Sequence, residues 1–148
     1  MQLTKFTDYG LRVLMYLAVQ GPERQPTARI AQSFDVSAHH LAKVATALVQ
    51  GGFVISGRGR QGGLELSRGA DEISIGAAVR HLTGSRPVVL ECFSASEGGC
   101  KIAPACGLRD PLAEAQDAFM NVLDQYTLKD VTRQKSQLHQ LLSLTTVE

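Results

Sequence analysis

The first 67 residues carry three segments with helical periodicity, followed by two alternating segments around a glycine-rich turn. In residues 3–19, apolar side chains recur every three or four residues, and Gly21 and Pro22 follow, so a helix is predicted there. The face that it is expected to bury comprises Leu3, Phe6, Gly10, Val13, Leu14 and Leu17. A chain with this beginning must pack short helices and a hairpin around one small core.

Two shorter helices are predicted next, and a tight turn separates them. Thr27 is expected to cap a helix over 28–34, and Ser37 to cap a longer one over 38–50, with the turn at "DVS" between them. The residues expected to face inward are Ile30, Ala31 and Phe34 in the first and Leu41, Val44 and Leu48 in the second. Two short helices joined by such a turn are typical of a helix-turn-helix.

A β-hairpin is predicted directly after these helices. Residues 53–56 and 64–67 alternate in polarity and flank the glycine-rich turn "GRGRQGG". The fold class is therefore mainly α with a small β-hairpin, a winged helix-turn-helix with a long dimerisation helix after it. We expect a DNA-binding domain over 1–83, a cysteine-rich loop over 84–107, and the dimerisation helix with a C-terminal helical segment over 108–148.

Outward-facing side chains of the third helix and the hairpin turn are candidate DNA contacts. They are Ser37, Ala38, His39, His40, Lys43 and Thr46 on the helix, and Arg58 and Arg60 in the turn. A helix in this position enters the major groove, and arginines between glycines can reach a narrow minor groove. The two histidines could instead be ordinary surface residues or metal ligands, and the hairpin a flexible one with solvated arginines.

Charge is distributed unevenly along the chain. Residues 1–68 hold eight Lys and Arg against four Asp and Glu, a net charge of +4, and the other eighty hold seven against ten, or −3. A basic front half fits binding to a polyanion, although charge alone is equally compatible with chance variation on a solvated surface.

Helices are also predicted in the second half of the sequence, and one of them is expected to bind a partner subunit. Ser74 can cap a helix over 75–82, and residues 127–141 form a shorter terminal helical segment. Between them, the apolar positions Leu108, Leu112, Ala115, Phe119, Val122 and Tyr126 repeat every three or four residues. Such a seam usually means core, but the front half already closes a core, so we expect a twofold dimer that requires a palindromic DNA site.

All three cysteines of the chain lie in one loop-like stretch, with the spacing C-x7-C-x5-C at Cys92, Cys100 and Cys106. The N-terminus has no signal-peptide pattern and no apolar run is long enough to span a membrane, so a cytoplasmic protein is expected. In that reducing compartment, clustered thiols favour metal binding or redox sensing over structural disulfides. The spacing lacks the close pair typical of zinc sites, which favours an iron–sulfur cluster whose fourth ligand is a His, an Asp, a Glu or an external molecule. Three ordinary cysteines are the alternative.

Several motifs resemble the Rrf2 family of bacterial transcription regulators. They are "MQLTKFTDYGLRVLMYLA", "GRGRQGG", "ISIGAAVR", "CKIAPACGL" and "LDQYTLKDV", which together span nearly the whole chain. Within that family the sequence is most similar to the nitric-oxide-sensing repressors. The resemblance implies a homodimer whose Cys92, Cys100 and Cys106 ligate an iron–sulfur cluster, either 4Fe-4S, which is preferred, or 2Fe-2S.

The resemblance also suggests the fourth ligand. In the 4Fe-4S type an aspartate in the first helix of the opposite subunit is the ligand, and the matching residue is Asp8. The branch that regulates cluster assembly has a ligand histidine where this chain has Arg109, which argues against that branch. The gap of seven residues after Cys92 is longer than in these relatives.

Three other functions compete with a nitric-oxide-sensing repressor. A cluster-free thiol switch and a regulator of iron–sulfur status would keep the DNA-binding half, whereas an electron carrier would have no use for it. An enzyme is not expected, because the chain has no phosphate-binding loop, nucleophile elbow or paired metal-binding histidines.

Overall fold

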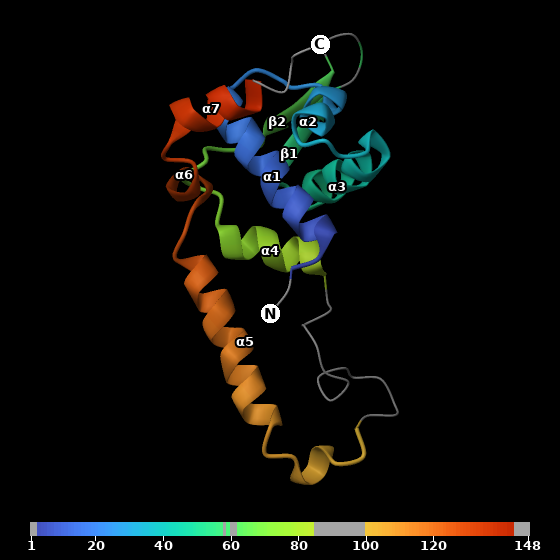
Figure 1. Ribbon diagram of the computed structural model, residues 1–148, viewed down its shortest axis with the longest axis vertical. Coiled ribbons are helices and arrows are strands. Elements are labelled where there is room, and N and C mark those ends of the chain that lie inside the picture. Colours follow the sequence, from blue (N-terminus) through green and yellow to red (C-terminus); the bar gives the residue numbers. More distant parts are fainter. Residues whose placement is uncertain (1–2, 58, 60–61, 85–99, 144–148) are drawn as a thin grey trace.

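The computed structural model describes residues 3–57, 59, 62–84 and 100–143. Its elements, in chain order, are α1 (Lys5–Gln20), α2 (Thr27–Ser33), α3 (Ala38–Gln50), β1 (Val54–Gly57), β2 (Gly63–Leu66), α4 (Ile75–Thr83), the 3₁₀ turn η2 (Ala103–Ala105), α5 (Arg109–Asp124), α6 (Leu128–Val131) and α7 (Lys135–Ser143). The mainly helical fold with one hairpin is as predicted. Figure 1 shows most elements gathered around α1, with α5 extending away from them.

Helix α1 forms the centre of the core. It begins after Thr4, whose hydroxyl accepts a hydrogen bond from the backbone N–H of Thr7 at 3.2 Å. The predicted inward face is correct at Gly10, Val13, Leu14 and Leu17, which are all buried. It is wrong at Phe6, which is 36% exposed, and Leu3 is only half-buried because it precedes the helix.

The turn between α2 and α3 has a specific geometry. The N–H of Val36 donates to Ala31 O at 2.9 Å and that of Asp35 to Gln32 O at 3.2 Å, the two bonds of a Schellman motif. Asp35 has φ +51°, the left-handed conformation that this motif requires. The motif ends α2 abruptly and sets the angle at which α3 follows.

One predicted cap is wrong by one residue. Helix α2 begins at Thr27, and Pro26 is its N-cap, because the Pro26 carbonyl accepts the N–H groups of Arg29 and Ile30 at 3.0 and 3.2 Å. The other two predicted caps are in the right place. The hydroxyl of Ser74 accepts the N–H of Ala77 at 3.2 Å, whereas that of Ser37 makes no capping bond within the described part of the chain.

The hairpin is antiparallel, and its two strands begin one residue later and one residue earlier, respectively, than predicted. Val54 pairs with Leu66 and Gly57 with Gly63. Gln25 extends the sheet on the other side of β2, where it exchanges backbone hydrogen bonds of 2.9 and 2.8 Å with Leu64. A Cβ on Gly63 would lie 2.7 Å from the Gln25 carbonyl oxygen, so this close approach requires glycine.

The chain after α5 returns to the core. Leu128 donates its N–H to Ile73 O at 2.8 Å, and its side chain is fully buried. Thr127 and Asp130 form a capping box that begins α6. The terminal segment predicted over 127–141 is therefore two short helices, and the second, α7, packs against α1 (Figure 1). Within the described ranges, none of the helices is both long and apolar enough to span a bilayer.

Candidate nucleic-acid interface and cysteine segment

Helix α3 presents a polar face away from the core. Its apolar stripe of Leu41, Val44 and Leu48 is buried to 1% exposure or less, which confirms the predicted orientation. All six candidate contact residues are consequently exposed: Ser37, Ala38, His39, His40, Lys43 and Thr46. They occupy the helix start and its first two and a half turns, the part that reads base edges in a helix-turn-helix. Their role as DNA contacts stays a prediction.

An ion pair joins the hairpin to the segment that precedes α2. Arg24 donates from Nε and Nη2 to Oε1 of Glu65 on β2 at 2.9 and 2.8 Å. Near the tip, Gly62 donates its N–H to Gly59 O at 2.8 Å, and Gly59 has φ +86°. Arg58 and Arg60 lie outside the described residues, so their role as DNA contacts stays a prediction. The ion pair joins residues 41 positions apart, and sequence patterns could not reveal it.

The cysteine segment comprises residues 92–106, and its described part, residues 100–106, lies beyond the N-terminal end of α5, the end distant from the winged helix (Figure 1). Cys100 and Cys106 are free thiols and half-buried, and Cys92 lies outside the described residues. Backbone bonds from Ala103 to Cys100 O and from Cys106 to Ala103 O, at 3.0 and 3.5 Å, fold the segment between them into η2. Two accessible thiols on one folded turn are a donor set that suits iron, zinc or copper(I).

Asp8 lies in the first turn of α1, within the winged-helix half. Its carboxylate pairs with Arg12 one turn later, at 3.2 Å from Nε to Oδ1 and 3.0 Å from Nη2 to Oδ2. Both side chains are nearly half exposed. The structure does not bring Asp8 together with Cys100 and Cys106 in one subunit, and among the described residues no group of three His, Cys, Asp or Glu is arranged to hold a metal.

Arg12 is a residue that the sequence interpretation missed. Besides pairing with Asp8, its guanidinium lies 5.8 Å from the ring centre of Phe34, the residue that ends α2. The spacing of four residues from Asp8 was a visible signal for the ion pair. The contact with Phe34, in contrast, depends on tertiary packing. Arg12 therefore connects the candidate ligand to the helix-turn-helix.

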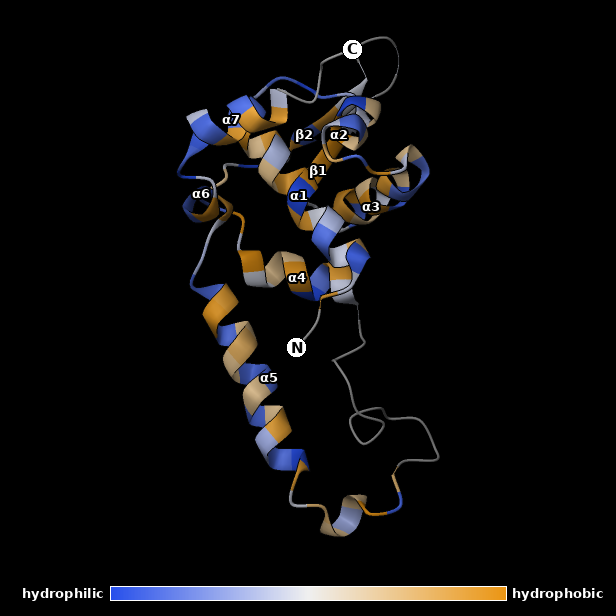
Figure 2. Ribbon diagram, viewed as in Figure 1, coloured by the Kyte–Doolittle hydropathy of each residue, from blue (hydrophilic) through white to orange (hydrophobic). Residues whose placement is uncertain are grey.

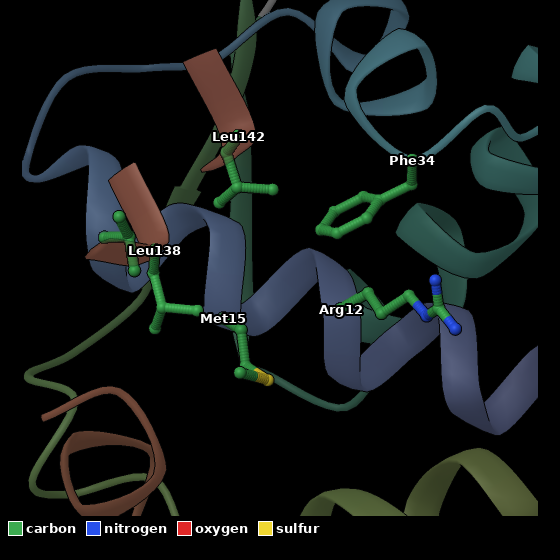
Figure 3. Close-up of a pocket in the computed structure, with 6 residues that line it drawn as sticks. Arg12, Met15, Phe34, Leu138 and Leu142 are labelled. Carbon is green, nitrogen blue, oxygen red and sulfur yellow. The ribbon is translucent and has the colours of Figure 1, made fainter. Parts of the chain in front are cut away.

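An apolar cavity of about 150 Å³ lies beside Arg12 (Figure 3). Met15 of α1, Phe34, and Leu138 and Leu142 of α7 are among the residues that line it. It is the point at which α7 covers α1 incompletely.

Helix α5 has no buried residue along its described length, which is the whole helix. Along its seam, Leu108 is 60% exposed, Val122 54% and Tyr126 48%. Figure 2 shows hydrophobic residues along this helix although it stands away from the others. An apolar seam with this exposure is typical of a surface that another chain covers.

The C-terminal end of α5 is fixed by a charged contact. Arg80 donates to both carboxylate oxygens of Asp124, at 2.6 and 2.5 Å. These hydrogen bonds lower the pKa of Asp124 and raise the pKa of Arg80. In α6, the backbone N–H of Thr127 and the guanidinium of Arg133 lower the pKa of Asp130 well below its ordinary value.

Comparison with known proteins gives consistent relatives over the whole chain. A family model named Rrf2, described as an iron-dependent transcriptional regulator, matches residues 3–134. The HTH-type transcriptional regulator NsrR of Bacillus subtilis strain 168 is 42% identical over 145 residues, which cover 97% of this chain and 99% of that protein. The regulator of the same name from Shouchella clausii is 38% identical over 149 residues, which cover 100% and 99%.

Solved structures of known proteins have folds similar to that of this chain. CymR of B. subtilis, described as its global cysteine regulator, superposes with a TM-score of 0.67 at 28% identity and covers 90% of this chain and 97% of that one. IscR of T. potens superposes with the same TM-score at 26% identity, covering 90% and 88%.

Proposed function

Since the chain belongs to the Rrf2 family of transcriptional regulators, we propose that it is a DNA-binding repressor that releases a palindromic operator in response to nitric oxide. Like its relatives, it is a transcriptional regulator and not an enzyme. The two halves of the molecule have separate tasks in this proposal. The winged helix binds DNA. The cysteine segment binds the cofactor through which the signal acts, and its described part forms, with α5, the arm over residues 100–126.

In this proposal, two parts of the chain bind DNA: the polar face of α3, and the wing, which is the β1–β2 hairpin with the turn between its strands. The exposed side chains of His39, His40 and Lys43 stand near the N-terminus of α3, where they can reach base edges and phosphates. Arg58 and Arg60 follow β1 directly in sequence and would contact the minor groove or its phosphates. The Arg24–Glu65 ion pair would hold the wing at a fixed angle while they do so.

Dimerisation through α5 supports the palindrome. Pairing two copies along the seam of Leu112 and Phe119, which are half-buried, and Val122, which is exposed, would remove its remaining apolar surface from water. A twofold axis there would place the two α3 helices symmetrically, as a palindromic operator requires.

The donor set of the cysteine segment fits an iron–sulfur cluster. Cys100 and Cys106 would hold it with Cys92, and both described thiols are free and partly accessible. A 4Fe-4S cluster is preferred over 2Fe-2S, as the family resemblance of the sequence motifs implies. When bound, such a cluster supplies iron that nitric oxide attacks.

Asp8 is the proposed fourth ligand, contributed by the opposite subunit. Its position in the winged-helix half of its own subunit supports a contact across the dimer, because it lies on a different half from the cysteines. To bind iron, its carboxylate would exchange the Arg12 ion pair for a bond to the metal. Carboxylate is a harder donor than thiolate, so this bond would be the weakest of the four and the first to break.

The observation that carries the proposal is the pair of free thiols at the start of a helix with no buried residue. The test is anaerobic purification followed by iron, sulfide and visible-absorption analysis. Iron and sulfide in amounts typical of a cluster should be present in the parent and lost in Cys100→Ala and Cys106→Ala. A colourless parent that binds its operator fully would contradict the proposal.

Asp8 is tested separately by Asp8→Ala, with Arg12→Ala as a matched control that breaks the same ion pair but keeps the carboxylate. If Asp8 is the ligand, only Asp8→Ala should change the absorption spectrum and the nitric oxide response. Identical spectra and responses in the parent and in Asp8→Ala would show that another group is the fourth ligand.

A thiol redox switch is the second candidate, and the free state of Cys100 and Cys106 favours it. The fold is also similar to that of S. aureus CymR in its oxidized form, at a TM-score of 0.70 and 27% identity. In this case an oxidant should change operator affinity in protein that contains no iron, and the change should reverse with dithiothreitol.

A further inference from the structure

The last turn of α4 contacts three different helices through three consecutive side chains. Arg80 reaches α5 through Asp124, and Leu82 packs on Gly10 of α1. His81 reaches the end of α3, where its Nε2 lies 2.6 Å from the carbonyl oxygen of Ala47. Since a carbonyl only accepts, Nε2 carries the hydrogen and donates it. This turn therefore joins three elements that are far apart in the sequence.

Glycine makes room for each of these contacts. A Cβ on Gly51 would lie 2.5 Å from Cδ2 of His81, one on Gly10 would overlap Leu82, and one on Gly76 would overlap the Asp124 carboxylate. None of the three has a positive φ, so backbone conformation does not require glycine at these positions. Gly10 and Gly76 also lie inside helices, where glycine is unfavourable relative to alanine. The available reason for glycine is space for the neighbouring side chain.

The contact of His81 lies at the junction between α3 and the β1–β2 hairpin. The Ala47 carbonyl that it engages also accepts the N–H of Gly51, at 2.9 Å, where α3 ends. The imidazole ring lies 5.7 Å from the ring of Phe53, which immediately precedes β1. One side chain of α4 thus touches the last turn of α3 and the start of the hairpin.

The same turn is connected to the cysteine segment. Helix α4 ends at Thr83, nine residues before Cys92, and α5 begins three residues after Cys106. The Arg80–Asp124 pair joins these two helices, so both ends of the segment lead to the last turn of α4. On the α5 side, a displacement that reaches Asp124 would act on Arg80 through this pair.

We propose that His81 is a positioning residue that couples the cysteine segment to α3, an inference that rests on the proposed function for the signal it transmits. Arg80 and Asp124 hold the turn to α5, and His81 passes its position to the Ala47 carbonyl. A hydrogen bond of 2.6 Å is lost beyond about 3.5 Å, so a shift of roughly 1 Å in α4 is enough to release it. Release would free the junction between α3 and the wing.

Exposure makes this inference testable without unfolding the protein. Both Arg80 and His81 are exposed, so their contacts lie outside the buried core and contribute little to its stability. His81→Phe keeps a ring over Phe53 and removes the donor, whereas His81→Gln keeps a donor and removes the ring. His139→Phe on α7 is the matched control, because His139 is likewise exposed and lies on a helix that packs against α1.

The first measurement compares operator affinity between cluster-loaded and cluster-free protein. In His81→Phe, the ratio of the two affinities should move toward 1 by about threefold to tenfold, the range expected for one hydrogen bond, with iron and sulfide content unchanged. His81→Gln should restore part of the ratio, and His139→Phe should retain all of it. An equal loss of affinity in both states would show a merely structural role and overturn the proposal.

The second measurement needs no cluster. Amide exchange at Gly51 and Phe53 reports the end of α3, because these N–H groups bond to Ala47 O and Leu48 O. Asp124→Asn should accelerate their exchange several-fold in the parent and not in the His81→Phe background. Additive effects would refute the coupling through His81. A parent without a cluster would instead refute the proposed function and leave this test valid.

Discussion

The winged-helix half and the α5 arm differ in how their apolar side chains are covered. In the first half, Leu14, Leu48 and Ile73 are fully buried within one chain. On the arm, Leu108 and Val122 are more than half exposed, although they repeat with the same helical period. Because burial of apolar area is the main favourable term in folding, the first half can be stable as a single chain. We propose that the arm gains the same term by contact with a partner chain.

Core truncation should have the largest effect on this contrast. Leu48→Ala should lower the free energy of unfolding by about 2–5 kcal/mol, because it removes a fully buried side chain and leaves a cavity. Leu141→Ala is the control, since Leu141 is 65% exposed and should change the free energy of unfolding by less than about 0.5 kcal/mol. Urea unfolding measures both, and equal losses would contradict the assignment of the core.

A charge on the arm should separate subunits while leaving each one folded. Val122→Asp should raise the dissociation constant of the dimer by at least about thirtyfold, corresponding to ~2 kcal/mol at an interface centre. Binding to palindromic DNA should fall with it. Sedimentation gives the association state and circular dichroism the fold. Variants at Leu112, Phe119 and Val122 that all stay dimeric would place the interface elsewhere.

The wing arginines should affect DNA binding without affecting either fold or association. Replacing Arg58 and Arg60 with alanine should weaken operator binding and reduce the slope of log affinity against log salt by about one unit for each lost phosphate contact. Titration at several salt concentrations measures the slope. The assignment fails if both affinity and slope match those of the parent.

Acid should produce the smallest effect, at the point where the arm rejoins the core. The pKa of Asp130 is lowered from 3.8 by the Thr127 N–H and by Arg133, so its ionised form stabilises the folded state. That contribution is present above the ordinary pKa and is lost as the pH falls below it. Asp130→Asn should therefore flatten the pH dependence of stability below about pH 4. A parent and variant with parallel acid-denaturation curves would exclude this role.

The two regions also differ in how well the sequence predicted them. Apolar periodicity identified Leu41, Val44 and Leu48 as the buried stripe of α3. Once this stripe faces the core, the orientation of the helix is fixed, and the residues on its opposite side must be exposed. The same periodicity on α5 described a seam but could not tell whether one chain or two would cover it. The structure describes one chain, so the dimer stays a prediction.

Contacts over long sequence distances were not predictable. The Arg24–Glu65 and Arg80–Asp124 pairs join residues 41 and 44 positions apart, and His81 meets Ala47 across 34. Local patterns carry no information about such pairs. The wrong cap at Thr27 is a smaller error of another kind: Pro26 carries no donor, but its carbonyl still begins the helix.

The central claim is that the cysteine segment on the arm controls DNA binding by the winged helix. It is tested most directly by measuring operator affinity of the anaerobically purified, cluster-loaded protein before and after nitric oxide, beside Cys106→Ala. The account predicts tight binding by the parent that is lost on adding nitric oxide, and weak binding by Cys106→Ala that nitric oxide does not change. Tight binding by the loaded parent that persists after nitric oxide would contradict it.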